Sequence, residues 1–539
     1  MRLMPDGRYG IEIDSRLLQL TDKSMELKVT EEQFCNALKG YKLNESLIVL
    51  GEISKILFDA NFKENELWKK EKIGFIIHKI SGQFVTEFAV EYIANLFLIC
   101  GSNDYKSLSL KDKDNILGIF SIYHNCLVHP PFKNNLFCLL IPMYLQQLTS
   151  QADIKDVLTR QILIFSKVLN EHSGPNKVDL NQYLIDETGM SIQDYTMLTF
   201  ILLAAILESP RFNIGKFTEA KEEPLKTILT NEKMEAILKM LSATPAELRA
   251  IDQLYNSKLP PENTKSRYNP LWQKPIVKLG DNDFVVPSTS AYKKGALTGL
   301  YWFFENRLKT KFRDYFGTLF EEYVGLIIKD TYDAQDIEPG IPYGSKKDAR
   351  EFFDWIVNDK GAYILFETKA YQFPFYVLQT GDLDSVRKEI LKKVVGTIRQ
   401  MYERVQDIQK YSELEKFKGK DLRCVAVFYD IPFISTNTYD EDIKAALNGM
   451  DSKYPGIKDF KYTLISVDEL ENYQYVKSCV TIEEVAERAR KTPGAGFTSE
   501  ISAIYKENNL DPKVARNLLD KKFDEFFSED IGFPYEETA

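Results

Sequence analysis

Three charged residues stand inside the apolar, strand-like runs of one short segment, and they are the strongest candidates for chemistry. The segment, residues 350–371, reads REFFDWIVNDKGAYILFETKAY and carries Asp354, Glu367 and Lys369. Charges are costly to bury without partners. Two carboxylates on one face form a hard oxygen site suited to Mg²⁺ or Mn²⁺. Because a nearby lysine can orient a water or stabilise charge on a phosphate, these groups together supply what phosphodiester hydrolysis needs.

A β-hairpin folded around the sequence NDKG would bring these three residues together. With a tight turn centred on residues 359–360, Asn358 pairs with Gly361 and Asp354 lies opposite Leu365. Side chains alternate faces along a strand, so both acids and the lysine then project from the same face. A turn longer by one residue would reverse that parity. The alternative interpretation of the segment is a salt bridge at a strand end.

The rest of the chain must supply the elements that position this hairpin. Residues 1–265 have mainly helical periodicity, with a proline-rich, polar linker at 256–270. The elements expected after the linker are a hairpin closed at GDND, a helix over about 300–330, strands over 334–342, 351–357 and 362–370, a helix over about 383–412, and strands at LRCVAVFYD and KYTLISV.

This order predicts a multidomain α+β protein. An all-α N-terminal region, 1–265, would be a regulatory or recognition domain. Residues 271–480 would form an α/β domain around a central mixed sheet, and residues 481–539 a helical C-terminal tail.

Residues 300–470 resemble the catalytic core of the PD-(D/E)XK, or restriction-endonuclease-like, nuclease superfamily. That core is a helix, three strands, a helix and a strand, with Asp on the second strand and (Asp/Glu)-x-Lys on the third. The resemblance implies that Asp354 and Glu367 bind Mg²⁺ or Mn²⁺ and that Lys369 acts on the attacking water. In YFGTLFEEYVGLIIKD it also implies a further metal ligand, Glu321, with Glu322 as the alternative.

The same resemblance implies substrate contacts on the helix that follows the motif, and basic residues before the aspartate strand are further candidates. Gln400, Lys392 and Lys393 lie on the helix that follows the motif, while Lys347 and Arg350 precede the aspartate strand. Basic residues gather in three places around the motif, which fits contacts to a phosphate backbone although solvated helix faces are the alternative. The remaining members of these groups are Lys309, Lys311, Arg313, Lys346, Arg387 and Lys388. Tyr371, Phe373 and Phe375 follow the motif and either stack on bases or are buried.

The composition restricts the other classes of function. The net charge is −10, so a nucleic acid would have to bind in a local basic cleft. Six single cysteines and no apolar signal core predict a cytoplasmic protein. The apolar stretch 195–209 is too short to span a bilayer, so it is expected to be a buried helix. A zinc site at His124, Cys126, His129 and Cys138 is the less favoured reading of that segment, because its spacing is not a standard one.

The sequence therefore predicts a metal-dependent nuclease, with DNA preferred to RNA as the substrate. By analogy with antiphage and restriction effectors, we expect a role in bacterial defence. The alternatives are an RNA-directed, toxin-like nuclease and a catalytically silent scaffold that binds nucleic acid. No membrane partner is expected. Two kinds of partner are left open: a second copy of the chain in a homodimer, and a partner protein bound by the helical region. An NTPase is one such partner, because the chain has no phosphate-binding loop of its own.

Overall fold

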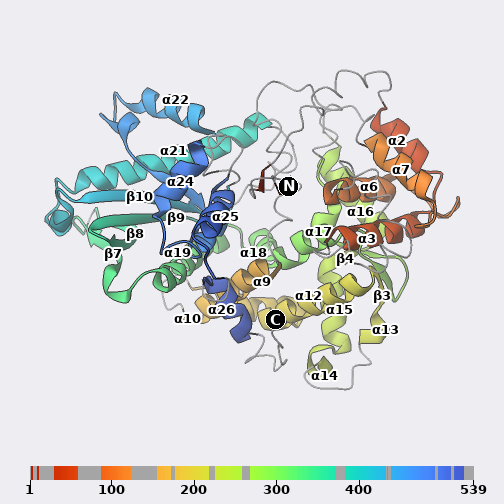
Figure 1. The fold of residues 1–539 in the computed structure, drawn as a ribbon. Helices are drawn as coiled ribbons and strands as arrows, with labels where there is room; N and C mark the ends of the chain where they lie inside the picture. The colour runs from red at the N-terminus through yellow and green to blue at the C-terminus, as the bar shows by residue number, and fades with distance from the viewer. Residues whose placement is uncertain are drawn as a thin grey trace.

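The protein is a mixed α+β molecule, mostly helical, with a four-stranded and a five-stranded mixed sheet and a helical N-terminal region (Figure 1). The computed structural model describes residues 2–3, 9–10, 29–58, 86–123, 154–171, 177–217, 225–257, 267–346, 348–371, 383–431, 434, 439–491, 496–511 and 515–526. A two-stranded ladder, β1 (Arg2–Leu3) with β2 (Tyr9–Gly10), precedes the helices.

The helical region is built from amphipathic helices whose apolar faces meet in two large clusters and one small one. Its larger helices are α2 (Glu31–Leu38), α3 (Leu43–Phe58), α6 (Glu87–Cys100), α7 (Lys113–Ser121), α9 (Ile154–Ile162), α11 (Leu180–Thr188), α12 (Ile192–Glu208), α15 (Asn231–Leu241) and α16 (Pro245–Asn256). Local sequence fixes several of their ends. Thr244 and Glu247 form a reciprocal capping box at the start of α16, with Pro245 in the first turn.

The region predicted to be all helical also contains strands, which corrects that expectation. Strands β3 (Arg211–Asn213) and β4 (Ser242–Ala243) join β5 (Ile276–Lys278) and β6 (Asp283–Val285) in a sheet of order β3-β6-β5-β4. Strands of two or three residues carry too little periodicity to be recognised without their partners. The predicted β5–β6 hairpin is confirmed, with Val277 paired to Val285.

One hydrophobic core runs from the helical region into the five-stranded sheet. The cluster contains Leu202 of α12, Phe304 of α18 (Gly299–Leu308), Phe320 of α19 (Thr310–Thr331) and Phe366 of the sheet, all fully buried. The small sheet separates this core from a second cluster between α3, α6 and α16. The helices before the predicted linker and the sheet after it are therefore packed together rather than loosely joined.

The five-stranded sheet has the order β11-β10-β9-β8-β7, antiparallel from β7 to β9 and parallel from β9 to β11. Its elements are β7 (Ile337–Tyr343), β8 (Arg350–Asp359), β9 (Ala362–Lys369), α21 (Leu383–Asp407), β10 (Asp421–Phe428), α22 (Asp440–Met450) and β11 (Thr463–Ser466). Helices α21 and α22 cover one face, and α19 with the later helices covers the other (Figure 1). The expected order of helices and strands is confirmed, except that helix α22, which was not predicted, lies between β10 and β11.

The register of the β8–β9 hairpin differs from the prediction by two residues. Asn358 pairs with Tyr363 and not with Gly361, because the turn is formed by Lys360 and Gly361. Both have positive φ, 53° and 89°, as a two-residue hairpin turn of the mirror-image type requires. A shift of two preserves the parity of the side chains, so continuing the register brings Asp354 level with Glu367 instead of Leu365.

The C-terminal helices are packed parts of the structure. They are α23 (Val467–Tyr473), α24 (Ile482–Lys491), α25 (Phe497–Glu507) and α26 (Leu518–Glu525). Helix α26 reaches α9 of the helical region through an ion pair of 2.7 Å between Lys155 and Asp520, whose carboxylate also accepts a hydrogen bond from Tyr475. The predicted tail thus bridges the two regions.

No single described helix has the length and apolar composition needed to cross a membrane. Helices α11 and α12 would pass such a test only as a pair bent by 66°. Most residues of α12 are buried in the core, including Tyr195, Leu198 and Leu202, which confirms the buried helix expected at 195–209.

Candidate active site

A β-bulge in strand β8 creates the place where the predicted site residues meet. Between the pairs Ile341–Phe352 and Pro339–Trp355, strand β7 has one residue and β8 has two, Phe353 and Asp354. Phe353 has a φ of 53°, which is unusual for a bulky residue and costs on the order of 1–3 kcal/mol. Bulges of this kind re-aim side chains and are common next to active sites.

At the bulge, the Asp354 side chain accepts hydrogen bonds from the neighbouring strand β9. One oxygen of its carboxylate accepts hydrogen bonds of 2.6 Å from both the backbone N–H and the hydroxyl of Thr368. The carbonyl of Phe353 points toward Gly340, where an added Cβ would lie 2.4 Å from it. Asp354 therefore ties the end of β8 to β9 and leaves its second oxygen for other partners.

Glu367 is the most deeply buried charged group of the site, with only 1% of its surface exposed. One of its oxygens accepts a hydrogen bond from the Lys369 amine and the other accepts one from the Arg404 guanidinium. A buried carboxylate requires such partners, because an unpaired charge in an apolar environment is very unfavourable. Glu367 and Lys369 thus share a face, as predicted, and this face is covered by α21.

Glu321 reaches the same place from α19, on the other side of the sheet. The indole N–H of Trp355 donates a hydrogen bond of 3.0 Å to the Glu321 carbonyl, and Trp355 packs on Gly325 one turn later. Burial, and then the negative charges of Asp354, Glu351 and Glu322, raise the pKa of Glu321 to about 8. The helix therefore holds Glu321 within electrostatic range of Asp354.

Two further charged residues belong to this site and were missed by the sequence analysis. Glu351, at the start of β8, has its pKa raised by burial and by the charge of Asp354. Arg404, on α21, bonds Glu367 and lies within electrostatic range of Asp354, Glu351 and Glu321; burial lowers its pKa. Arg404 lies four residues after Gln400, so helical spacing could have identified it. Glu351 gave no such signal, because the bulge breaks the alternation of the strand.

Lys369 lies between the acids of the two faces. Burial lowers its pKa, and the charges of Asp354 and Glu321 oppose that effect. Its side chain keeps 30% of its surface exposed, in contrast with Glu367. The Lys369 side chain is therefore partly exposed while its amine is held by a buried carboxylate.

The predicted substrate residues are only partly gathered at the site. Lys393 and Gln400 share one stripe of α21 with Arg404, and the Lys393 amine lies 5.3 Å from the centre of the Tyr371 ring. Lys392 is exposed beside that stripe. Arg350 instead forms ion pairs with Asp348 at 3.2 Å and Asp407 at 3.0 Å, which hold β8 to the end of α21.

Other predicted residues lie outside the site or outside the described part of the chain. Arg313 pairs with Glu305, and Arg387 pairs with Asp442, so both have structural partners. Lys309 and Lys311 are exposed near the start of α19, Lys346 is exposed before β8, and Lys388 is exposed on α21. The residues outside the described ranges are Lys347, Phe373, Phe375, His124, Cys126, His129 and Cys138.

The donor chemistry of the site fits a hard divalent cation. Four carboxylates gather around Lys369 and Arg404, and mutual repulsion contributes to the raised pKa values of Glu321 and Glu351. In the described ranges, no three His, Cys, Asp or Glu side chains already stand in an arrangement that would hold a metal ion. Metal binding would therefore require a side-chain rearrangement, and Glu367 would have to exchange one of its two cationic partners.

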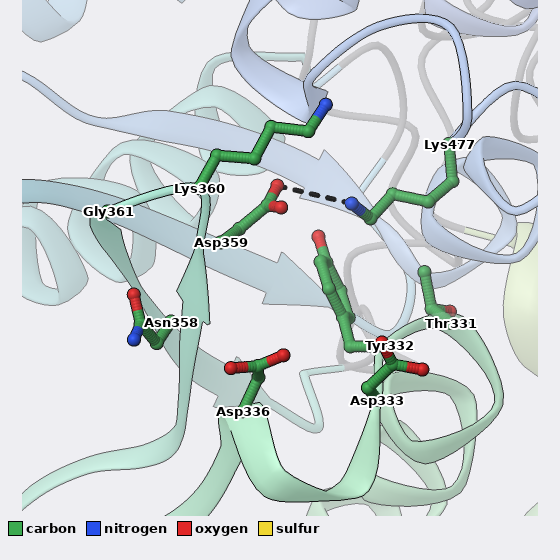
Figure 2. A pocket seen from close by; sticks show the side chains of 9 residues that line it. All are labelled: Thr331, Tyr332, Asp333, Asp336, Asn358, Asp359, Lys360, Gly361 and Lys477. Carbon is green, nitrogen blue, oxygen red and sulfur yellow. Dashed lines mark hydrogen bonds and ion pairs between the residues drawn. The ribbon is translucent and has the colours of Figure 1, made fainter.

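A separate pocket of about 490 Å³ lies at the opposite end of the hairpin, beside the β8–β9 turn (Figure 2). Lys477 lies between the Asp359 carboxylate, at 3.2 Å, and the ring of Tyr332, at 4.4 Å. Figure 2 shows Asp333 and Asp336 on the rim away from this pair. None of the predicted site residues lines the pocket.

Comparison of the chain with protein-family models, with curated proteins and with solved structures found no match.

Proposed function

We propose that the chain is a metal-dependent nuclease whose residues 310–466 have the restriction-endonuclease-like fold. The supporting topology is the order α19, β7, β8, β9, α21, β10 around a mixed sheet. The observation that carries the proposal is the convergence of Asp354, Glu367 and Lys369 at a strained bulge inside apolar strands. Strained backbone persists where the surroundings enforce it, and it concentrates at functional sites.

In this proposal Asp354, Glu367 and Glu321 hold Mg²⁺ or Mn²⁺. When bound, the ion would polarise a phosphoryl oxygen and lower the pKa of a water molecule. Lys369 would direct its N–H groups at the attacking water and at the negative charge that develops on the phosphate, because it is the more exposed of the two cations in the cluster. The oxygen of water would form a bond to phosphorus and give up a proton, the bridging P–O bond would break, and the leaving oxygen would take up a proton.

DNA is the proposed substrate, held by the stripe of α21 that carries Lys393 and Gln400. The net charge of −10 disfavours a wholly basic binding surface, so contacts would concentrate at this helix. A homodimer, a partner protein on the helical region and a role in antiphage defence are further proposals that follow from the resemblance only.

The test is an assay of supercoiled plasmid, linear DNA and structured RNA in Mg²⁺, Mn²⁺ or EDTA, with Asp354→Ala alongside the wild type. We expect metal-dependent cutting of DNA that falls at least about 100-fold in the variant. Preferential cutting of RNA would establish the RNA-directed alternative. Cutting that persists in EDTA or in Asp354→Ala would contradict the assignment of the site.

A catalytically silent scaffold is the second candidate, and one observation favours it. Both oxygens of Glu367 already have cationic partners, so this carboxylate is satisfied without a metal. A scaffold would bind nucleic acid in EDTA and in Mn²⁺ alike, whereas the nuclease would bind Mn²⁺ and cleave.

A further inference from the structure

The guanidinium of Arg404 stands at the centre of the acidic site. It bonds one oxygen of Glu367, and its side chain is 14% exposed. The carboxylates of Asp354, Glu351 and Glu321 all lie within electrostatic range of it. Arg404 of α21 thus bonds one acid of the site directly and is influenced electrostatically by three more, which come from β8 and α19.

The aromatic ring of Phe353, at the bulge, stabilises the position of the Arg404 guanidinium. The centre of its guanidinium lies 5.7 Å from the ring of Phe353, the residue whose positive φ creates the bulge. A cation over an aromatic ring gains further stabilisation when it is desolvated. The strained residue therefore both aims Asp354 and supports Arg404.

The position of Arg404 has a consequence for any divalent cation that binds at these acids. A carboxylate oxygen hydrogen-bonded to a guanidinium has to loosen that bond before it can coordinate a metal, and two cations at one buried site repel each other. Lys369 does not compete with a divalent cation in the same way. Its amine bonds the other oxygen of Glu367, and its side chain is more exposed than that of Arg404.

We propose that Arg404 occupies the cation position of the site in the absence of metal and is displaced from Glu367 when a divalent ion binds. This inference rests on the proposed metal-dependent function and adds to it a residue and an order of events. The displaced guanidinium stays at the site because it is attached to α21, one turn from Gln400. A planar guanidinium matches two phosphate oxygens, so the substrate phosphate becomes its next partner.

The two roles predict opposite effects of removing Arg404. Without the competing charge, the protein binds Mn²⁺ more tightly, by about tenfold on the usual scale of coupling between two sites. Without the phosphate contact, DNA is bound and cleaved more weakly even when Mn²⁺ is saturating. A merely structural arginine that oriented Glu367 would give weaker Mn²⁺ binding when removed.

The experiment measures Mn²⁺ affinity by titration calorimetry on the full chain, for wild type, Arg404→Ala, Arg404→Lys and Arg399→Ala. Arg399 is exposed on the same helix and serves as the matched control. We expect tighter Mn²⁺ binding for Arg404→Ala, near wild-type binding for Arg404→Lys because the charge is kept, and no change for Arg399→Ala. Binding of DNA in Ca²⁺ should weaken for Arg404→Ala.

Circular dichroism shows which variants are folded, and Arg404→Gln replaces Arg404→Ala if the alanine variant is not. Unchanged or weaker Mn²⁺ affinity of the folded variant, with normal affinity in the wild type, overturns the inference and leaves the proposed nuclease intact. If neither wild type nor variant binds Mn²⁺, the proposed metal site itself fails and this inference fails with it.

Discussion

At the scale of single residues, the three charges inside the hairpin are explained by their partners. Glu367 is neutralised by Lys369 and Arg404, and Asp354 replaces a backbone acceptor for Thr368. Every one of these contacts joins different strands or helices or fixes the end of a strand. The same charged residues therefore form the candidate site and stabilise its structure.

The sequence predicted that Asp354, Glu367 and Lys369 lie together, and Lys369 does bond Glu367, but Arg404 and Glu351 were missed. The Asp, Glu and Lys positions followed from charges inside apolar strands. Arg404 and Glu351 did not, because their placement depends on how α21 packs on the sheet and on the bulge at Phe353. Long-range packing of this kind leaves no periodic signal in a single chain.

Glu87 of α6 gives a prediction about pH far from the candidate site. Its buried carboxyl accepts a hydrogen bond of 2.8 Å from Ser54, and burial raises its pKa to about 8. In the folded protein it stays protonated over a range in which the unfolded chain ionises it. Its contribution to stability therefore falls as the pH rises from about 4.5 to about 8, by about 1 kcal/mol per pH unit.

Glu87→Gln removes this penalty, so the variant should gain stability relative to wild type as the pH rises from 6 to 8.5. The measurement is the difference between their melting temperatures at several pH values. Glu235→Gln, at an exposed position of α15, is the control. A difference that does not change with pH would show that Glu87 is ionised in the folded protein.

At the scale of elements, the candidate site depends on how closely α19 approaches β8. A Cβ added to Gly325 would lie 2.1 Å from the Trp355 ring, whereas one added to Gly317 on the same helix would meet nothing within 4 Å. The glycine at 325 is thus required by a close approach of helix and strand. The sequence offered no means of telling these two helical glycines apart.

Gly325→Ala should destabilise the protein by about 1–3 kcal/mol and lower cleavage, because overpacking pushes α19 and Glu321 away from β8. Gly317→Ala should instead be neutral or stabilising by up to about 1 kcal/mol, since alanine favours the helix. Urea unfolding and cleavage rates check both variants. Equal effects of the two substitutions would contradict this account of the helix–strand contact.

At the scale of the molecule, buried charge links the helical region to the sheet. Arg160 of α9 donates a hydrogen bond of 2.7 Å to Glu471 of α23, which also accepts one from the hydroxyl of Tyr323 on α19. Glu471 is 2% exposed, and Tyr323 is two residues from Glu321. The position of the helical region is therefore connected directly to the helix that carries a candidate site residue.

The domain organisation is the part of the fold that the sequence described least well. Helix and strand order after residue 300 followed from periodicity, but the short strands β3 and β4 and the shared core depend on contacts between distant segments. A polar, proline-rich stretch such as 256–270 indicates a loop, and it does not reveal how tightly the flanking segments pack.

Arg160→Met should leave Glu471 buried without its cation and destabilise the protein by about 3–5 kcal/mol. Arg211→Ala breaks an exposed ion pair with Asp283 and should cost less than about 1 kcal/mol. Thermal unfolding and limited proteolysis compare the two. A small effect of Arg160→Met would show that the two regions are held together by the apolar core alone.

The most direct test of the central claim compares Lys369→Ala with Lys360→Ala in cleavage of supercoiled plasmid with Mn²⁺. Both lysines belong to one hairpin, but Lys369 bonds Glu367 at the site while Lys360 lies in the turn at the other end. We predict that Lys369→Ala loses at least about 100-fold in cleavage rate while Lys360→Ala keeps wild-type activity. Equal activity of the two folded variants would contradict the assignment of this site.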